Sequence, residues 1–474
     1  MQSQTLTPQV AALPGVLAIA ADVSARNISA LEVAEAALAR IAAKNPDLNA
    51  IIETNVAAAR ADAEEIDRRV TAGERMPLAG VPVAIKDNIW VAGHRVTQGS
   101  ALFANFHPPE DAIAVARLKR AGAVVIGMAN TSEFAAKGLT TNRLYGPTCH
   151  PMDHNLTPGG SSGGPVVAVA AGLVPFAIGT DAGGSSRRPA AHVGVVGFKP
   201  SLGAVPYGPG FSEPFVGLSC ICPIAQTVKE IIAVFDVLAA PDPRDPDSIQ
   251  VAPAGWISGE RIRIAYSPRF GLSTPVDDDV AEAVERAIEQ LIVVGFEVVR
   301  KDPIWPSAAI ETALMPLQYA GLAAIHGEAF RRDPGVFDSD IAAQIERGLG
   351  ISGAEVASAW MISSEIARSV ASYFAEFHFD LLVGPTTPCV AWPLELLGPE
   401  RIGGVFVPPR GHAVFTPFFN HAKVPALSMP CGSGRDRLPV GLQIVAARGN
   451  DRRLLTFASR AESIIIGDSD STWR

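Results

Sequence analysis

Short apolar runs alternate with amphipathic helical patterns in two stretches of the chain, and this alternation constrains the fold more than any other feature. The order strand, helix, strand is predicted at Val81–Ile85, Ala112–Ala121 and Val124–Ile126, and again at Arg261–Tyr266, Val276–Val294 and Phe296–Arg300. A helix that joins two neighbouring strands is the unit from which parallel sheets are built. The sequence therefore predicts an α/β fold with a largely parallel sheet.

Two helices are predicted before the first of these strands. Ser29 and Glu32 form an S-x-x-E capping box for the first, over Asn27–Lys44, and Pro46 is expected to end it. The second covers about Thr54–Val70, an Ala-rich and charged segment.

The charge balance argues against a nucleic-acid partner. The chain has 39 basic and 48 acidic residues, a net charge of −9, whereas nucleic-acid-binding proteins present a basic face. Hydrophobic residues make up 48% of the 474 residues, which excludes an intrinsically disordered chain. The five cysteines are scattered and form no C-x-x-C pair, which favours a cytoplasmic protein without a disulfide framework or a zinc site.

The longest apolar run extends from Pro165 to Ile178 and is interrupted by Gly172 and Pro175. It is shorter than the roughly 20 residues that span a bilayer. We therefore predict a buried helix here and no membrane contact.

A glycine- and serine-rich stretch, Thr157–Pro165, directly precedes this apolar run. Glycine permits close approach of a ligand to the backbone, and a helix start offers free N–H groups. The stretch also matches G-x-S-x-G, the nucleophile elbow of α/β-hydrolases, with Ser161 at the serine position. That elbow follows a strand, and Met152–Pro158 is turn-like instead, so we interpret the match as coincidental.

A second glycine-rich stretch, Gly179–Pro189, places two glycines directly before Ser185. Several backbone N–H groups can converge there on one point, as an oxyanion hole requires. Lys86 ends a predicted apolar strand; if it is desolvated, its pKa falls and it can act as a base, and the alternative is a lysine that reaches solvent. None of the nine histidines lies in a recognisable triad context, so a lysine base and a bridging serine would supply what a serine nucleophile needs.

These motifs resemble those of the amidase signature family of serine hydrolases. Lys86 lies in Lys-Asp-Asn, residues 159–164 read Gly-Gly-Ser-Ser-Gly-Gly, and residues 179–189 match Gly-Thr-Asp-x-Gly-Gly-Ser-x-Arg-x-Pro. The intervals also match the family, with 75 residues from Lys86 to Ser161 and 24 from Ser161 to Ser185. Family-like segments extend the resemblance over about residues 25–460: Asn130–Phe134, Tyr145–Pro147, Gly197–Pro200, Cys222–Thr227, Gly384–Pro388 and Leu438–Gln443.

The resemblance implies a role for each motif residue. Ser185 resembles the nucleophile, Ser161 the bridging serine that the family holds after a cis peptide bond, and Lys86 the general base. The oxyanion hole would be formed by the backbone N–H groups of Ala182, Gly183, Gly184 and Ser185, and supporting positions would be Ser162, Asp181 and Arg187. No metal or organic cofactor is implied.

The resemblance also implies a mixed, twisted central sheet flanked by helices on both faces. We expect a single domain over residues 1–474, because the Pro-rich loop 241–253 is not followed by an independent domain signature. Within it, N-terminal helices would occupy about 1–74, the catalytic core about 75–230, and a C-terminal half at about 255–474 would complete the sheet and the substrate pocket.

The expected activity is hydrolysis of the C–N bond of small-molecule amides, with aryl amides and carbamates as candidates, through a Ser185 acyl-enzyme. Aromatic residues of two segments are candidate pocket walls or core residues: Tyr207, Phe211, Phe215, Phe415, Phe418 and Phe419. Several positions depart from the family pattern and bear on the pocket: Met128, Pro165, Ser186, Arg188 and His192. The expected partner is a small-molecule substrate, and a homodimer is the candidate assembly.

Three alternatives remain open from the sequence. One is the glutaminase subunit of a tRNA-dependent amidotransferase, which would use the same residues and pass ammonia to a partner. Another is a Ser-His-Asp esterase that uses Ser161. The third is a silent binding protein on the same fold, which the intact triad positions disfavour.

Overall fold

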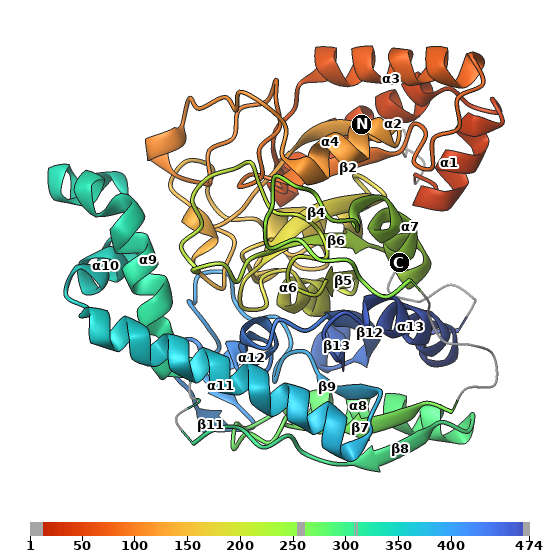
Figure 1. Cartoon of the computed structure of the whole chain (residues 1–474). Helices are drawn as coiled ribbons and strands as arrows, with labels where there is room; N and C mark the ends of the chain where they lie inside the picture. The colour runs from red at the N-terminus through yellow and green to blue at the C-terminus, as the bar shows by residue number, and fades with distance from the viewer. Residues whose placement is uncertain (1–12, 254–260, 308, 310, 468–474) are drawn as a thin grey trace, which may run out of the picture.

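One large mixed sheet forms the centre of the molecule (Figure 1). The structure is a computed structural model that describes residues 13–253, 261–307, 309 and 311–467. The eleven strands of the sheet lie in the order β1-β3-β2-β4-β6-β5-β12-β13-β9-β7-β8. Their bounds are β1 Ile51–Glu53, β2 Pro82–Lys86, β3 Val124–Ala129, β4 Phe176–Asp181, β5 Val196–Lys199, β6 Cys220–Ala225, β7 Arg263–Tyr266, β8 Glu297–Arg300, β9 Leu381–Pro385, β12 Ala426–Ser433 and β13 Pro439–Ala446.

Helices flank the sheet on both faces. In chain order they are α1 Val16–Ser24, α2 Ala30–Leu48, α3 Val56–Thr71, α4 Ile113–Arg120, α5 Gly163–Ala170, α6 Arg187–Val193, α7 Val228–Leu238, α8 Asp278–Val293, α9 Glu311–Arg332, α10 Ser339–Leu349, α11 Gly353–Phe377, α12 Pro417–His421 and α13 Asp451–Ile465. In Figure 1, α9 and α10 lie at the left edge of the molecule, and α11 runs diagonally from there across its lower part. A separate two-stranded ribbon joins β10 Arg401–Ile402 to β11 Val405–Phe406.

The prediction of a largely parallel sheet is wrong, and the mixed sheet implied by the family resemblance is confirmed. The parallel pairs are β2–β3, β2–β4, β7–β8 and β7–β9, and the other pairs are antiparallel. The strand–helix–strand pattern is visible only in the two outer groups of strands. In the centre of the sheet each neighbouring pair in the order β6-β5-β12-β13 is antiparallel, and no repeated pattern in the sequence marks these strands.

The first of the two predicted helices corresponds to α2, and it continues past its predicted end. The capping box at its start is confirmed, since Ser29 and Glu32 each bond the other's backbone N–H. The helix passes Pro46 and ends at Leu48, with Asn49 in the left-handed conformation. A proline in the last turn removes a single helical hydrogen bond, and the Asn45 side chain accepts bonds from the N–H groups that follow the helix.

The apolar run from Pro165 to Ile178 is not one buried helix, as predicted, but a helix and a strand. Helix α5 ends at Ala170, Gly172 turns the chain with φ of +65°, and β4 begins at Phe176. The two residues that interrupt the run, Gly172 and Pro175, therefore separate two buried elements.

The register of the sheet brings the motif residues together. Strands β2 and β4 are parallel neighbours with Ile85 opposite Ile178, so their carboxyl ends lie at one edge. Lys86 ends β2 and Asp181 ends β4. The turn from β4 to α6 carries Ser185, and α5 begins directly after the other glycine-rich stretch. Across the described ranges, no helix is both long and apolar enough to cross a membrane.

Helix α5 can approach β3 only because Gly164 has no side chain. A Cβ at Gly164 would lie 2.3 Å from the backbone N of Asn130 and 2.7 Å from the backbone O of Ala50. We predict that Gly164→Ala lowers the free energy of unfolding by about 1–3 kcal/mol in urea titrations, because backbone must move. Gly353→Ala is the matched control, since Gly353 also begins a helix and has open space around its Cβ position. Equal stability of the two variants would contradict this account of the packing.

Candidate active site

Lys86 is fully buried and its amino group is held by two hydroxyls. Its Nζ donates to Ser161 Oγ at 2.8 Å and to Thr180 Oγ1 at 2.9 Å, and the residue has 0% exposure. The alternative of a lysine that reaches solvent is therefore wrong. Burial lowers the pKa of Lys86 to about 7. Cys222 and Asp181 have smaller effects, which raise this pKa. A substantial fraction of this amine is neutral at neutral pH.

The glycine-rich stretch before α5 places the Ser161 hydroxyl within hydrogen-bond distance of the Lys86 amine. The peptide bond between Gly160 and Ser161 is cis, as the resemblance implied. The next residue fixes this stretch to the second motif, since Ser162 N donates to Ser185 O at 3.0 Å and Ser162 Oγ to Thr180 O at 3.1 Å. Within the described part of the chain, no hydrogen bond joins the hydroxyls of Ser161 and Ser185.

The backbone around Ser185 contains N–H groups that have no acceptor within the protein's described residues. Ala182, Gly183 and Ser185 line the pocket, and no described residue accepts a hydrogen bond from their N–H groups. The N–H of Gly184 differs from the expectation, because it donates to Asp181 Oδ1 at 2.7 Å. Three of the four expected donors thus have no acceptor among the described residues, and the fourth is bonded to Asp181.

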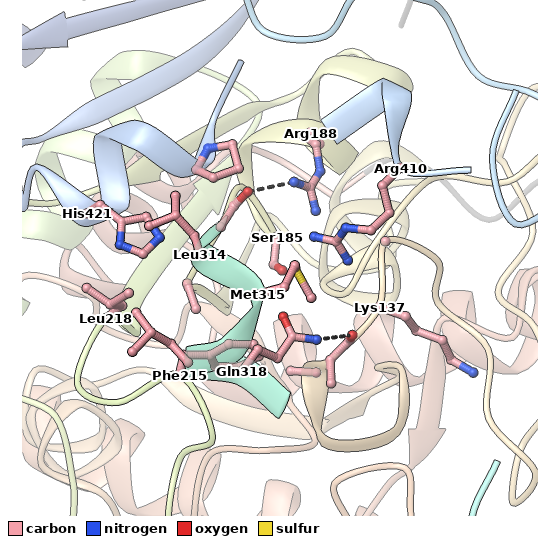
Figure 2. A pocket seen from close by; sticks show the side chains of 17 residues that line it. Lys137, Ser185, Arg188, Phe215, Leu218, Leu314, Met315, Gln318, Arg410 and His421 are labelled. Atoms are coloured by element: carbon pink, nitrogen blue, oxygen red, sulfur yellow. Dashed lines mark hydrogen bonds between the residues drawn. The ribbon is translucent and has the colours of Figure 1, made fainter. Parts of the chain in front are cut away.

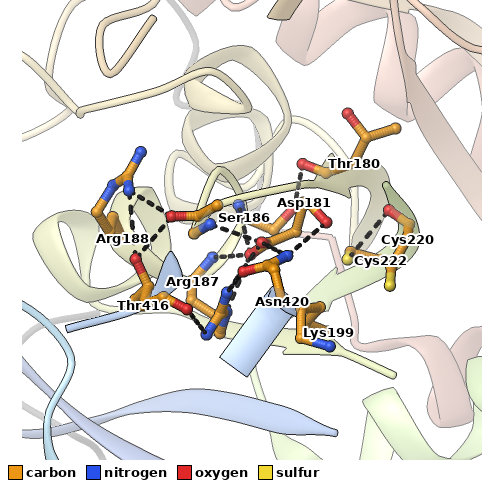
Figure 3. A network of polar contacts seen from close by, with 12 residues as sticks. Thr180, Asp181, Ser186, Arg187, Arg188, Lys199, Cys220, Cys222, Thr416 and Asn420 are labelled. Carbon is orange, nitrogen blue, oxygen red and sulfur yellow. Dashed lines mark hydrogen bonds and ion pairs between the residues drawn. The ribbon is translucent and has the colours of Figure 1, made fainter. Parts of the chain in front are cut away.

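A buried ion pair lies beneath this turn (Figure 3). Arg187 donates to both carboxylate oxygens of Asp181, at 3.0 and 2.9 Å, and both side chains are fully buried. Asn420 Nδ2 donates to the same carboxylate at 2.9 Å. Burial alone would raise the pKa of the Asp181 carboxyl, but the charge and hydrogen bonds of Arg187 and the hydrogen bond of Asn420 hold that pKa well below its usual range.

Two further residues hold the carbonyl of Gly183. Arg188 Nη1 donates to Gly183 O at 2.6 Å, and Thr416 Oγ1 donates to it at 2.8 Å. Since the adjacent N–H of Gly184 is bonded to Asp181, this peptide group is held from both sides. Its fixed orientation also sets the orientation of the neighbouring N–H groups of Gly183 and Ser185.

A small pocket, with a cavity volume of about 70 Å³, lies over Ser185 (Figure 2). Helix α9 and the segments around residues 135–138 and 215–218 form much of its wall. Cationic side chains also line it: Lys137, Arg188 and Arg410.

The aromatic candidates divide between pocket and core. Phe215 lines the pocket. Phe415, Phe418 and Phe419 are buried in the main core, and Phe211 packs against Trp90, Phe103 and Phe106. Among the positions that differ from the family pattern, Met128 and His192 are buried and do not line the pocket, whereas Arg188 lines it.

The sequence reasoning missed several residues of the site. Thr180 could have been noticed, because it lies inside the Gly-Thr-Asp motif and parallel pairing places it beside Lys86. Thr416, Asn420 and Gln443 come from the distant C-terminal segment, and Gln443 Oε1 accepts from Arg187 at 2.8 Å. Of these three, only Gln443 lies in a family-like segment. His421 lines the pocket but bonds Ser363 Oγ at 2.8 Å.

Comparisons with known proteins identify similar chains. The sequence profile of the Amidase family matches residues 32–455. The chain is 33% identical over 460 residues to an acylamidase of Rhodococcus erythropolis, with 94% of each chain covered. It is 36% identical over 462 residues to a subunit of the glutamyl-tRNA(Gln) amidotransferase of Roseiflexus castenholzii, with 90% of this chain and 91% of the relative covered. A solved bacterial aryl acylamidase of the amidase signature family superposes with a TM-score of 0.86 at 25% identity over 96% of each chain.

The buried ion pair generates a stability prediction. Asp181→Asn preserves the shape of the side chain but leaves the Arg187 charge buried without its counter-ion, so we expect a loss of about 3–5 kcal/mol in free energy of unfolding. Chemical denaturation measures this loss. Glu35→Gln, which breaks the exposed ion pair with Arg60, is the control and is expected to leave the unfolding midpoint unchanged. A similar midpoint for both variants would show that Asp181 is not needed to compensate Arg187.

Proposed function

The chain belongs to the amidase signature family, and we propose that it hydrolyses the C–N bond of small-molecule amides through an acyl-enzyme on Ser185. The observation that carries this proposal is the buried Lys86 amine, 2.8 Å from Ser161 Oγ. The adjacent Ser162 N–H donates to the backbone carbonyl of Ser185, and Ser185 lines the pocket. A desolvated lysine is a competent base near neutral pH. No cofactor has a role in this scheme.

The proposed chemistry begins with a proton relay. Neutral Lys86 accepts a proton from Ser161 Oγ as Ser161 accepts one from Ser185 Oγ, after rotation of the serine hydroxyls into contact. Ser185 Oγ then attacks the amide carbonyl, and the C–N bond breaks as the proton returns through Ser161 to the leaving nitrogen. Water hydrolyses the resulting ester by the same relay.

The charge that develops on the carbonyl oxygen would be stabilised by backbone N–H groups. Those of Ala182, Gly183 and Ser185 are the best placed, and the Gly184 N–H would take part only if it left Asp181. Loss of one such donor typically costs about 10²–10³ in rate. Asp181, Arg187 and Ser162 would act by holding this turn in place.

The pocket favours small organic amides. Phe215, Leu218 and Leu314 give it an apolar wall that suits an aryl or alkyl group. The acylamidase and aryl acylamidase similarities support amide substrates. Aryl amides are therefore the first substrates to test, and aryl carbamates, which share the carbonyl and leaving-group geometry, are the second. We further propose action in the cytoplasm, without a nucleic-acid or membrane partner.

A second candidate is the glutaminase subunit of a tRNA-dependent amidotransferase, because relatives from such enzymes match at comparable identity. Glutamine carries an α-ammonium group, and no Asp or Glu is found among the described residues that line the pocket to receive it. This observation favours the amidase. A Ser161 esterase is disfavoured because Lys86, not a histidine, bonds Ser161.

The proposed function predicts that Ser185 is the nucleophile. We expect amine or ammonia release from one of four probes, namely acetamide, glutamine, 4-nitroacetanilide and an aryl carbamate, and a loss of at least about a thousandfold in Ser185→Ala. Lys86→Ala should cost about a hundredfold or more. If Ser185→Ala matches the wild type, the nucleophile is wrong. Release from glutamine alone, increased by a partner subunit, would favour the amidotransferase.

The proposed function also predicts how kcat/KM depends on pH. Because Lys86 must be neutral and its pKa is lowered to about 7, kcat/KM should rise as pH increases through about 7 and level off above it. A slow anilide substrate keeps chemistry rate-limiting. Glu133 also has a pKa raised to about 7, chiefly by burial, so Glu133→Gln is the control that should leave the midpoint in place. A flat profile from about pH 5 to 9 would contradict the role of Lys86.

A further inference from the structure

One side chain of the pocket wall, Gln318, has a fixed amide group with a free oxygen. Its Nε2 donates to the backbone carbonyl of Ala136 at 2.9 Å and to Gln344 Oε1 at 2.6 Å. A backbone carbonyl can only accept, so the amide must turn its nitrogen toward Ala136. Both N–H groups of the amide are therefore used within the protein, and no donor among the described residues bonds Gln318 Oε1.

This oxygen belongs to the same pocket as Ser185. Gln318 is half-buried on α9 and lines the pocket, and its Oε1 is not sealed in the interior. Figure 2 shows the oxygen on the side of the Gln318 amide group that is nearer to Ser185. Because the cavity is only about 70 Å³ in volume, a substrate that brings its carbonyl to Ser185 also brings the atoms attached to that carbonyl close to this wall.

The described lining is richer in donors than in acceptors. Three of its side chains carry N–H groups only, namely Lys137, Arg188 and Arg410. Gln318 is the only side chain of the described lining with an amide or carboxylate oxygen. An amide substrate with an N–H presents both an acceptor and a donor at its reacting bond, whereas an ester presents acceptors alone. The combination of many donors with one fixed acceptor therefore matches an amide better than an ester.

The turn that holds Gln318 is itself in an unusual conformation. Phe134 and Ala135, which precede Ala136, have φ of +52° and +58° and are buried. Residues other than glycine rarely adopt this conformation. It persists only where the surroundings hold it, and such sites concentrate around functional groups. The Phe134 ring stacks on His326 of α9, with centroids 3.9 Å apart, so the turn and α9 together set the position of the Gln318 amide.

We propose that Gln318 Oε1 accepts a hydrogen bond from the N–H of the scissile amide, and that the enzyme thereby prefers amides with an N–H to esters and to N,N-disubstituted amides. This inference rests on the proposed function, since it concerns the same pocket. The hydrogen bond would hold the leaving nitrogen while the carbonyl lies on Ser185. An ester oxygen in the same place would face Gln318 Oε1 with no proton between the two acceptors.

Three substrates that differ only at the scissile bond test this inference: 4-nitroacetanilide, N-methyl-4-nitroacetanilide and 4-nitrophenyl acetate. Gln318→Met removes the acceptor and keeps the length of the side chain. We expect kcat/KM for the first anilide to fall about five- to hundredfold, the range for a donor left without its acceptor. The N-methyl anilide and the ester, which have no N–H, should be nearly unaffected.

Gln344→Met is the matched control. It removes the other partner of Gln318 Nε2 but leaves Gln318 Oε1 in the pocket wall, so the ratio of anilide to ester turnover should stay as in the wild type. Equal losses for the anilide and the ester in Gln318→Met would show that Gln318 only supports the wall, and would overturn the proposal.

Binding to Ser185→Ala, measured by calorimetry, gives a readout that does not need turnover. 4-Nitroacetanilide should bind more tightly than its N-methyl derivative, and adding Gln318→Met should abolish the difference. That result supports the acceptor even if the wild type cleaves no amide, and then the proposed hydrolysis alone fails. If Gln318→Met does not fold, equal binding of the two anilides to Ser185→Ala overturns the proposal. Cleavage of the anilide without any dependence on Gln318 would overturn the acceptor and leave the hydrolase standing.

Discussion

The buried pair of Asp181 and Arg187 is the interaction on which the site depends. Asp181 ends a central strand, and Arg187 begins the helix that follows the turn. Their ion pair closes that turn, and the same carboxylate accepts the N–H of Gly184 and the side chain of Asn420. The carboxylate therefore orients the backbone on either side of Ser185. A buried ion pair contributes little to net stability, and the role of this pair is to hold the turn around Ser185 in one geometry.

The same burial governs the acid–base properties of the site. Lys86 and Asp181 end parallel neighbouring strands, so an amine and a carboxylate lie at one edge of the sheet. Arg187 neutralises the carboxylate more directly than Lys86 does, which leaves desolvation as the largest influence on the pKa of the lysine. The hydroxyls of Ser161 and Thr180 can bond either the charged or the neutral amine. The fold thus keeps a basic amine in the interior without a carboxylate that is paired directly with it.

Local patterns predicted the residues of the site better than its surroundings. The capping box of α2 and the strand that ends at Lys86 follow from short-range spacing, and the glycine-rich motifs identified both serines. Pairing of distant strands left no comparable signal, so the mixed order of the sheet was expected only through family resemblance. Thr416 and Asn420 hold the turn around Ser185 from more than two hundred residues away. Contacts between residues so far apart in the sequence depend on tertiary packing, and the periodicity of hydrophobic residues contains no information about it.

The position of these C-terminal contacts has a consequence for synthesis of the chain. Domains begin to fold from the N-terminus as the ribosome extends them, and Lys86, Ser161 and Ser185 leave the ribosome before the C-terminal segment that holds their turn. Asn420 and Gln443, which bond Asp181 and Arg187, are synthesised more than two hundred residues after Ser185. Strand β5 also needs β12 as its neighbour. The turn that bears the nucleophile therefore acquires its full set of contacts long after the nucleophile itself has been synthesised, and a chain terminated between Ser185 and Asn420 carries Lys86, Ser161 and Ser185 without the contacts that orient the turn.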